Sequence, residues 1–268
     1  IVFNNSMLGM VYHGRRLFKD PIPDGLSPHF KQVDFTQVAE GLGARGIRVE
    51  RPGTITPEFM AEVFASGQPT VIDVLIDKDA NLKLAAEYSI WSAMANAGQS
   101  CIGAERVYVV DSKCNEFITE ISSRAKKLEA GKDYGRATMP PQIDVIRNHI
   151  SDAVSKGGQF VIGGMDSIKE TIVEPIIMKN VPEDSLEVSE ETFGPTLVIN
   201  TVKNAEEAIN LANNSNYGLG AAVYSAKSGE AIAAKLNCGM VSINAVFIFA
   251  GIPSIPFGGV KDSGYGRI

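Results

Sequence analysis

The sequence predicts an α/β fold made of two dissimilar parts. Apolar strands alternate with helical runs along almost the whole chain, and the connections between them are short. The pattern changes character near residue 77. We therefore expect a partial three-layer parallel α/β unit over residues 1–77 and a larger alternating α/β domain over residues 78–268.

The first part follows the order strand, helix, strand, helix, strand. Asp34 and Thr56 are suitable N-cap residues, and Pro57 suits the first position of the helix that Thr56 begins. The expected elements are a strand at 1–3, a helix at 34–40, a strand at 44–49, a helix at 56–65 and a strand at 69–77. This order at short spacing is typical of a parallel sheet covered by helices.

The second part begins with a mostly apolar helix over residues 82–94, which Gly98 ends. The elements expected after it are a strand at 106–110, helices at 115–128 and 142–155, strands at 160–162, 172–178 and 195–202, a helix at 205–213, a strand at 221–225, a helix at 229–236 and a strand at 240–244. This alternation predicts a second α/β domain.

Composition excludes several classes of protein. Apolar residues make up 44% of the 268 residues and the net charge is −6, without a basic patch, so we expect neither nucleic acid nor a membrane as a partner. No run of about eighteen apolar residues occurs. Three cysteines give no disulfide framework, which favours a reducing cytoplasm.

Cys101 is the candidate nucleophile. It follows a Gly-Gln pair at the end of a helix and precedes a strand, so it lies in a tight connection where backbone amides can face a reacting oxygen. A lone cysteine is more often an inert packing residue, and only the surrounding motifs favour catalysis here. For Cys114 we expect a surface thiol, and for Cys238 a small packing residue.

Three downstream motifs accompany Cys101. They are Glu-Glu-Thr-Phe-Gly-Pro at 190–195, Asn-Tyr-Gly-Leu-Gly at 216–220 and Pro-Phe-Gly-Gly-Val-Lys-Asp-Ser-Gly-Tyr-Gly-Arg at 256–267. In this order and at these distances they resemble the aldehyde dehydrogenase superfamily, across roughly residues 74–268. The resemblance implies an aldehyde dehydrogenase-like catalytic domain that is C-terminally truncated, because the family's subunit-contact strand would follow Arg267.

The resemblance also implies roles for single residues. Cys101 corresponds to the catalytic thiol, Glu191 to the acid that holds the nicotinamide-side ribose, and Phe193 to the residue packed beside the nicotinamide. Asn244 corresponds to a position close to the substrate pocket. The expected activity is oxidation of a small-molecule aldehyde to an acid with NAD or NADP, through a cysteine thioester, in a family of homo-oligomers.

Parts of the family's machinery are not found in the sequence. The general-base glutamate is expected just before residue 74, and the oxyanion-hole asparagine and the dinucleotide-binding domain are expected further upstream. Glu87 and Glu105 lie near Cys101, but neither matches the base, so we expect surface or structural roles for both. Impaired turnover is therefore expected.

The first part carries a different resemblance. Asn4-Asn5 followed by Leu-Gly-Met-Val at 8–11, with similar matches at 33–35 and 44–49, resembles the C-terminal domain of thiamine-diphosphate enzymes of the acetolactate synthase type. This implies that Asn4 and the Ser6 carbonyl ligate Mg²⁺ and that Met10 contacts thiamine diphosphate. The Gly-Asp-Gly half of that metal site is not found, so the site is expected to be incomplete.

The two resemblances meet between about Val74 and Leu84, with no Gly/Ser/Pro linker between them. We interpret this as a splice inside a strand–turn–helix that two unrelated folds share. Three interpretations stay open: an aldehyde dehydrogenase domain with a foreign N-terminal segment, a thiamine-diphosphate-dependent carboligase or lyase fragment, and a non-catalytic chimeric product.

Overall fold

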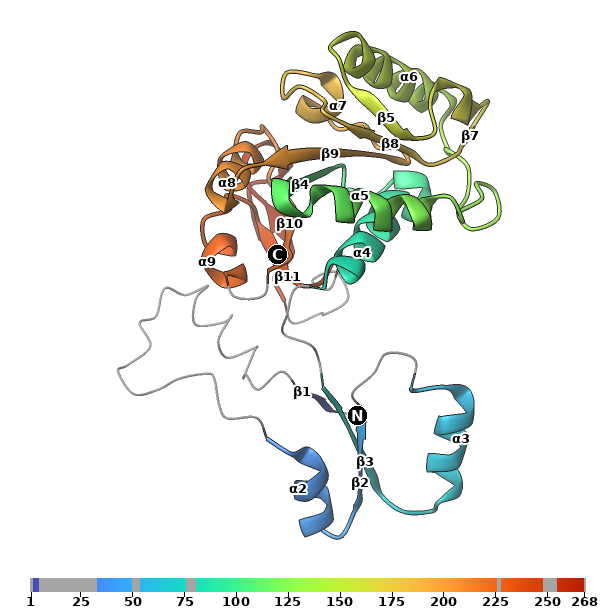
Figure 1. The fold of residues 1–268 in the computed structure, drawn as a ribbon, viewed down its shortest axis with the longest axis vertical. Coiled ribbons are helices and arrows are strands. Elements are labelled where there is room, and N and C mark those ends of the chain that lie inside the picture. Colours follow the sequence, from blue (N-terminus) through green and yellow to red (C-terminus); the bar gives the residue numbers. More distant parts are fainter. Residues whose placement is uncertain are drawn as a thin grey trace. The chain divides into compact units, whose positions relative to one another are not determined.

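Both parts of the chain form α/β structure, as the sequence predicts. The computed structural model describes residues 2–4, 33–49, 54–75, 81–225, 228–247 and 255–267, and gives the backbone alone at 2–4, 73–75 and 266–267. The chain divides into two compact units, Ile1–Lys78 and Asp79–Ile268 (Figure 1). Each unit is described by itself below.

Unit 1 contains a small parallel sheet. Its strands β1 (Val2–Asn4), β3 (Thr70–Leu75) and β2 (Arg45–Val49) lie in the order β1-β3-β2, and both pairs are parallel. Figure 1 shows the helices α2 (Phe35–Gly41) and α3 (Pro57–Ala65) on opposite sides of this sheet. The predicted order of elements is therefore confirmed.

Both predicted N-caps of unit 1 are present. The Asp34 carboxylate accepts the N–H groups of Thr36 and Gln37, at 3.0 and 3.2 Å. The Thr56 hydroxyl oxygen accepts the N–H of Phe59 at 3.1 Å. Each cap satisfies donors that have no partner inside the helix, and this fixes where each helix begins.

Unit 2 is organised around a four-stranded sheet. The strands are β4 (Arg106–Val110), β9 (Thr196–Val202), β8 (Ile176–Lys179) and β5 (Gln159–Ile162), in the order β4-β9-β8-β5. The first three are parallel, and β5 is antiparallel to β8. A mainly parallel sheet needs cover on both faces, which explains the apolar composition of β8 and β9.

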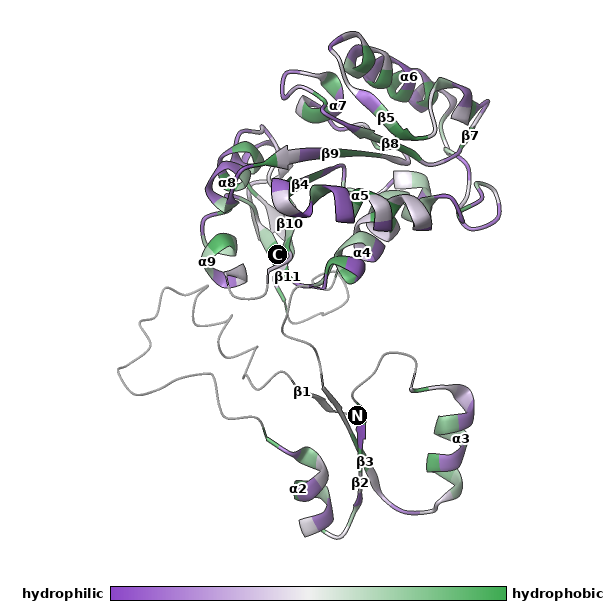
Figure 2. Cartoon of the chain, viewed as in Figure 1, coloured by the Kyte–Doolittle hydropathy of each residue, from purple (hydrophilic) through white to green (hydrophobic). Residues whose placement is uncertain are grey.

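Two helical layers cover this sheet (Figure 1). Ile177 and Leu197 point into the core formed with α4 (Leu82–Met94) and α5 (Asp111–Ala125). Their neighbours Ile176 and Val198 point into the opposite core, formed with α6 (Pro140–Ser155). Figure 2 shows the apolar character of β8. Alternate strand residues thus serve opposite cores, which gives three layers.

Smaller elements complete unit 2. They are the hairpin β6 (Ile168–Lys169) and β7 (Ile172–Val173), the helices α7 (Leu186–Ser189), α8 (Ala205–Asn213) and α9 (Gly229–Ala233), the parallel pair β10 (Gly220–Val223) and β11 (Met240–Ile243), the antiparallel pair β12 (Gly258–Gly259) and β13 (Gly266–Arg267), and the 3₁₀ turns η1 (Ala95–Gly98), η2 (Met165–Ser167) and η4 (Lys261–Ser263). In the described part of the chain no helix combines the length and apolarity that crossing a membrane requires.

Among the predicted boundaries that differ from the structure, two have a clear physical reason. The strand expected at 172–178 is two strands, because Pro175 separates β7 from β8 and has no N–H to donate to a ladder. The helix expected at 115–128 begins at Asp111, directly after β4, and its first turn carries the Asp111 carboxylate. A negative charge in a first turn is favourable, because it faces the positive end of the helix dipole.

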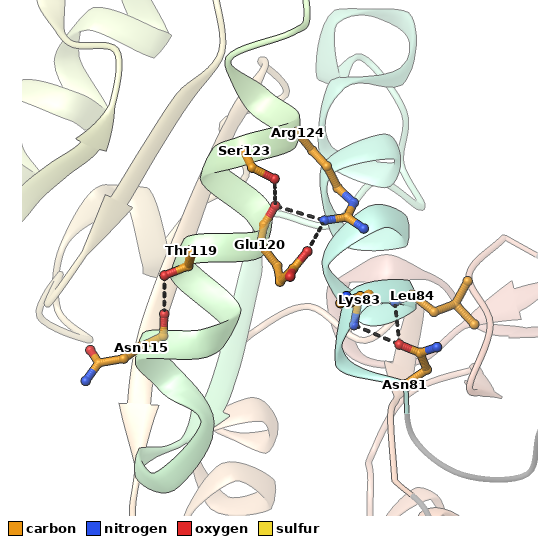
Figure 3. A network of polar contacts seen from close by, with 8 residues as sticks. All are labelled: Asn81, Lys83, Leu84, Asn115, Thr119, Glu120, Ser123 and Arg124. Atoms are coloured by element: carbon orange, nitrogen blue, oxygen red, sulfur yellow. Dashed lines mark hydrogen bonds and ion pairs between the residues drawn. The ribbon is translucent and has the colours of Figure 1, made fainter.

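The helix that leads to Cys101 is capped at its start, and α5 beside it carries an ion pair (Figure 3). The Asn81 side-chain oxygen accepts the N–H groups of Lys83 and Leu84, at 3.0 and 3.3 Å. On α5, Arg124 pairs with Glu120 at 2.6 Å. Arg124 also lines an open pocket of about 640 Å³ together with Trp91 of α4, so this ion pair lies where the two helices meet.

Candidate active site

Cys101 lies in a loop with an unusual backbone, which we call the Cys101 loop (residues 95–105). After α4, three consecutive residues adopt positive φ: Asn96 at 55°, Ala97 at 57° and Gly98 at 71°. Non-glycine residues adopt this conformation only at a cost of about 1 kcal/mol or more each. Such strain persists where the surroundings hold it, and it concentrates at functional sites.

Hydrogen bonds fix the Cys101 loop on both sides of the thiol. The side chains of Asn96 and Gln99 each donate to the other's carbonyl oxygen, at 2.8 and 2.9 Å. Further along, Gly103 donates to the Ser100 carbonyl at 2.8 Å, and the buried Ser92 hydroxyl accepts the Ala104 N–H at 3.0 Å. The loop therefore presents its cysteine from a fixed backbone.

Of the three cysteines, all of them described, Cys101 alone is exposed. Cys238 is half-buried, and its thiol contacts the Met240 carbonyl oxygen at 3.3 Å. Cys114 is buried, so the prediction of a surface thiol there is wrong. It lies on the face of α5 that packs on the sheet, where the Thr201 hydroxyl donates to its sulfur at 3.1 Å. Access to reagents therefore favours Cys101.

Gln99 has a role that the sequence analysis missed. Its Oε1 accepts both the N–H and the hydroxyl of Thr138, each at 2.8 Å, and its Nε2 also donates to the Arg136 carbonyl at 3.2 Å. This amide therefore ties the Cys101 loop to the segment before α6. The Gly-Gln pair beside the cysteine was the available signal, but it does not reveal the partner.

The 190–195 motif lies directly against the Cys101 loop. A Cβ atom on Gly98 would lie 1.9 Å from the Gly194 carbonyl oxygen, so the two backbones are in contact. Four residues after the cysteine, the Glu105 carboxylate accepts the N–H of Phe193 at 2.7 Å and that of Thr192 at 3.2 Å. Two motifs that are far apart in sequence are thus joined at two points.

Thr192 is completely buried, and all its polar groups are bonded. Its N–H meets Glu105, its carbonyl oxygen accepts from Gln142 Nε2 at 2.6 Å, its hydroxyl donates to Glu187 at 3.3 Å, and His149 Nδ1 lies 3.0 Å from that hydroxyl. We call these five residues the Thr192 cluster. It anchors the middle of the motif inside the domain.

Three ionisable groups of the Thr192 cluster are perturbed by burial. Burial raises the pKa of Glu187 to about 7, and the hydroxyls of Thr196 and Thr192 oppose that rise only in part. Burial also raises the pKa of Glu105, against the two N–H groups that it accepts. Burial lowers the pKa of His149. His149 is thus a core residue.

On either side of Thr192 the motif faces outward. Glu191 is exposed, although partial burial raises the pKa of its carboxyl, and Phe193 is half-buried with φ at 52°. The neighbouring Glu190 accepts the Tyr217 hydroxyl at 3.1 Å, which brings in the 216–220 motif. Lys261 donates to the carbonyls of residues 213 and 215, which adds the 256–267 motif. All these motifs gather within unit 2.

The side chain of Asn244 is engaged. Its oxygen accepts the Ser225 N–H at 3.0 Å, and its nitrogen donates to the Ser225 carbonyl at 3.2 Å. It has φ at 53° and follows β11 directly. Three residues later, the Phe247 ring lies 4.9 Å, centroid to centroid, from Trp91. Asn244 therefore fixes the loop that leads to this aromatic pair.

The predicted sites of unit 1 fall mostly outside the described residues. Asn4 ends β1, but its side chain is not among those described, and Ser6 and Met10 lie outside the described ranges. Where the structure does describe side chains, no three His, Cys, Asp or Glu residues gather as a metal site would need. The magnesium and thiamine diphosphate sites stay predictions.

Comparison with known proteins agrees with the motifs. Residues 71–268 match the aldehyde dehydrogenase family. The chain belongs to the aldehyde dehydrogenase family. Residues 1–74 match the C-terminal TPP binding domain of thiamine pyrophosphate enzymes, so both resemblances are confirmed. The two matches overlap at 71–74, inside β3, slightly before the meeting point expected at 74–84.

This chain spans about half the length of the relatives that it matches. A lactaldehyde dehydrogenase of Methanococcus maripaludis is 38% identical over 202 residues, which is 72% of this chain and 43% of the relative. An aldehyde dehydrogenase structure from Brucella melitensis biovar abortus has a TM-score of 0.63 at 30% identity, and an NAD⁺ complex from Bacillus cereus has 0.65 at 27%. Each structural match covers 83% of this chain and 48% of the other.

Proposed function

We propose that residues 78–268 form the thiol-bearing domain of an oxidoreductase that converts an aldehyde to an acid with NAD or NADP, and that residues 1–77 form a separate partial domain. The observation that carries this proposal is the contact between the Cys101 loop and the 190–195 motif, at Gly98 and at Glu105. The nucleophile and the segment assigned to the nicotinamide are thereby close enough to act on one substrate.

Cys101 is assigned the nucleophilic step. As a thiolate, its Sγ adds to the aldehyde carbon, a C–S bond forms, and the carbonyl electrons move to the oxygen. The Cys101 N–H donates to that oxyanion, and the fixed backbone of the loop holds this donor without reorganisation. The exposure of Cys101 gives the aldehyde access to the sulfur.

Glu191 and Phe193 fit a nicotinamide nucleotide. The exposed Glu191 carboxylate is an acceptor for ribose hydroxyls, and the Phe193 ring offers an apolar surface for a pyridine ring. When bound, the dinucleotide supplies the acceptor for the hydride that leaves the substrate carbon. Neither residue distinguishes NAD from NADP, so NAD and NADP are both proposed as the cofactor.

We propose slow turnover for this chain. Residues 1–74 match the thiamine-enzyme domain at the place where the general-base glutamate was expected. A general base typically contributes about 10²- to 10⁴-fold in rate, so hydrolysis of a Cys101 thioester is expected to be the slow step. Asn244 remains proposed as a residue beside the substrate pocket, where it acts on the loop that carries Phe247.

Protection of Cys101 by aldehydes tests this function. Limiting iodoacetamide is added with and without a series of short aldehydes, and the labelled peptides are quantified by mass spectrometry. We expect concentration-dependent protection of Cys101 in the folded protein and none after denaturation. Labelling of Cys101 that no aldehyde changes would contradict the proposal and favour the non-catalytic interpretation. A parallel absorbance assay for reduced nicotinamide measures how far turnover proceeds.

A further inference from the structure

We propose that Glu105 is a positioning residue that holds the nicotinamide-side segment 191–193 in register with Cys101. This inference rests on the function proposed for residues 78–268. It concerns a residue whose sequence context indicated only a surface or structural role.

The contacts of Glu105 are those of an ionised carboxylate. Its two oxygens accept two consecutive backbone N–H groups, Oε1 that of Phe193 at 2.7 Å and Oε2 that of Thr192 at 3.2 Å. A protonated carboxyl must use one oxygen as a donor, so it cannot accept equally well at both. Hydrogen bonds to a charged acceptor are also stronger than those between neutral groups.

The segment needs such a restraint. Phe193 has φ at 52°, a conformation that is unfavourable for a bulky side chain. Its N–H is the group that Glu105 binds most closely, so the carboxylate holds the strained residue itself. The Thr192 cluster fixes the inner side of the segment, and Gln142 of α6 holds the carbonyl oxygen of Thr192.

The same residue is tied to the thiol. Glu105 ends the Cys101 loop, and its own carbonyl oxygen accepts the Val198 N–H of β9 at 2.9 Å. The preceding Ala104 N–H is held by Ser92 of α4. The backbone at Glu105 is therefore held by both the sheet and α4. Its side chain binds the Phe193 N–H, so Phe193 is held in a fixed position relative to that backbone.

The pKa of Glu105 depends on burial and on several neighbouring groups. Burial raises its pKa, the N–H groups of Phe193 and Thr192 lower it, Glu191 raises it further and Arg106 lowers it. Within the Thr192 cluster, the charge of Glu105 also raises the pKa of Glu187, because the two carboxylates repel each other. The other titratable group of the cluster, His149, lies beside the hydroxyl of Thr192. Protonation of Glu105 at low pH should therefore release the segment.

Hydrogen–deuterium exchange tests the proposal on the full chain. The variants are Glu105→Gln and, as a matched control, Glu116→Gln, an exposed residue of α5 paired with the exposed Lys113. We expect Glu105→Gln to raise exchange at the amides of Thr192 and Phe193 about tenfold while β9 and α5 stay unchanged, and the control to match the wild type. Iodoacetamide labelling of Cys101 should stay within about twofold, since other bonds hold its loop.

The pH profile separates positioning from simple packing. In the wild type, protection of the two amides relative to free peptide should fall as the pH drops through the raised pKa of Glu105, and in Glu105→Gln it should be low at every pH. Unchanged exchange at residues 192 and 193 in the variant, or an equal rise across the whole domain, would overturn the proposal. Adding NAD⁺ tests the proposed function separately. Slower exchange across residues 190–195 supports that function, and unchanged exchange counts against it. The comparison of the variants decides the role of Glu105 in either case.

Discussion

The backbones of Gly98 and Gly194 touch, leaving no room for even a methyl group between them. A Cβ on Gly98 would lie 1.9 Å from the Gly194 carbonyl oxygen and 2.8 Å from the Pro195 nitrogen. Because both obstacles are backbone atoms, neither can swing aside as a side chain would. This contact sets the distance between the Cys101 loop and the 190–195 motif.

We therefore predict that Gly98→Ala destabilises unit 2 by about 1–3 kcal/mol through overpacking, with a further cost from its φ of 71°. Urea unfolding gives the free energy, and iodoacetamide labelling of Cys101 reports whether the loop has moved. Gly135→Ala is the control, because a Cβ there has no heavy atom within 4 Å. Equal stability of the two variants would show that the contact is not tight.

The buried Glu187 carboxyl predicts a pH-dependent stability. Its pKa is about 7 in the folded state, above the ordinary value of 4.5, so the folded state binds the proton more tightly. The contribution of this carboxyl to the stability of the folded state is fully present when the pH is below the ordinary pKa of 4.5, and it is lost as the pH rises through about 7. Glu187→Gln should remove this loss. Between about pH 5 and pH 8, the free energy of unfolding of the variant should therefore fall by about 1–3 kcal/mol less than that of the wild type.

Urea unfolding across that pH range measures the effect, with Glu116→Gln as the control that keeps the wild-type slope. An unchanged pH dependence in Glu187→Gln would mean that the carboxyl is not the group that titrates. Gln retains an oxygen that can accept the Thr192 hydroxyl, so the substitution changes the charge and leaves that hydrogen bond.

Asn244 is predicted to act on its loop through Ser225. In Asn244→Asp the donor to the Ser225 carbonyl is lost and a negative charge faces that oxygen, so we expect a loss of about 1–2 kcal/mol in unfolding free energy. Asn210→Asp, at an exposed position of α8, is the control. Direct contact of Asn244 with an aldehyde would instead appear as altered protection of Cys101 at unchanged stability.

Sequence reasoning was most successful where the signal is local. Caps at Asp34 and Thr56 follow from residue type beside a helical run, and the helix over residues 205–213 was found at its observed bounds. It failed for Cys114, because which face of α5 meets the sheet depends on packing and not on the residue itself.

The candidate site shows the same division. The order of motifs was enough to recognise the family, and it proposes Cys101, Glu191 and Phe193 as site residues. The roles of Glu105 and Gln99 depend on partners far along the chain, namely Phe193 and Thr138. A carboxylate or an amide in a sequence carries no information about which distant N–H it will meet, so these contacts became visible only in the structure.

Residues 1–77 are predicted not to complete a dinucleotide site, since their match is to a thiamine-enzyme domain. Isothermal titration of the full chain with NAD⁺ and NADP⁺ should therefore give binding weaker than micromolar for both. Micromolar affinity for either would show this prediction wrong. It would also strengthen the assignment of Glu191 and Phe193, provided that the Glu191→Gln variant loses the affinity.

The central claim is that Cys101 is a nucleophile held in a prepared loop, and acyl transfer tests it most directly. The protein is treated with p-nitrophenyl acetate, quenched in acid and digested, and the acetylated residue is located by mass spectrometry, with Cys101→Ser as the comparison. The account predicts a thioester at Cys101 in the folded wild type. It predicts no acetylated cysteine in the Cys101→Ser variant, and no acetylation of Cys101 above background in the denatured protein. Acetylation of Cys238 or of lysines with Cys101 unmodified would contradict it.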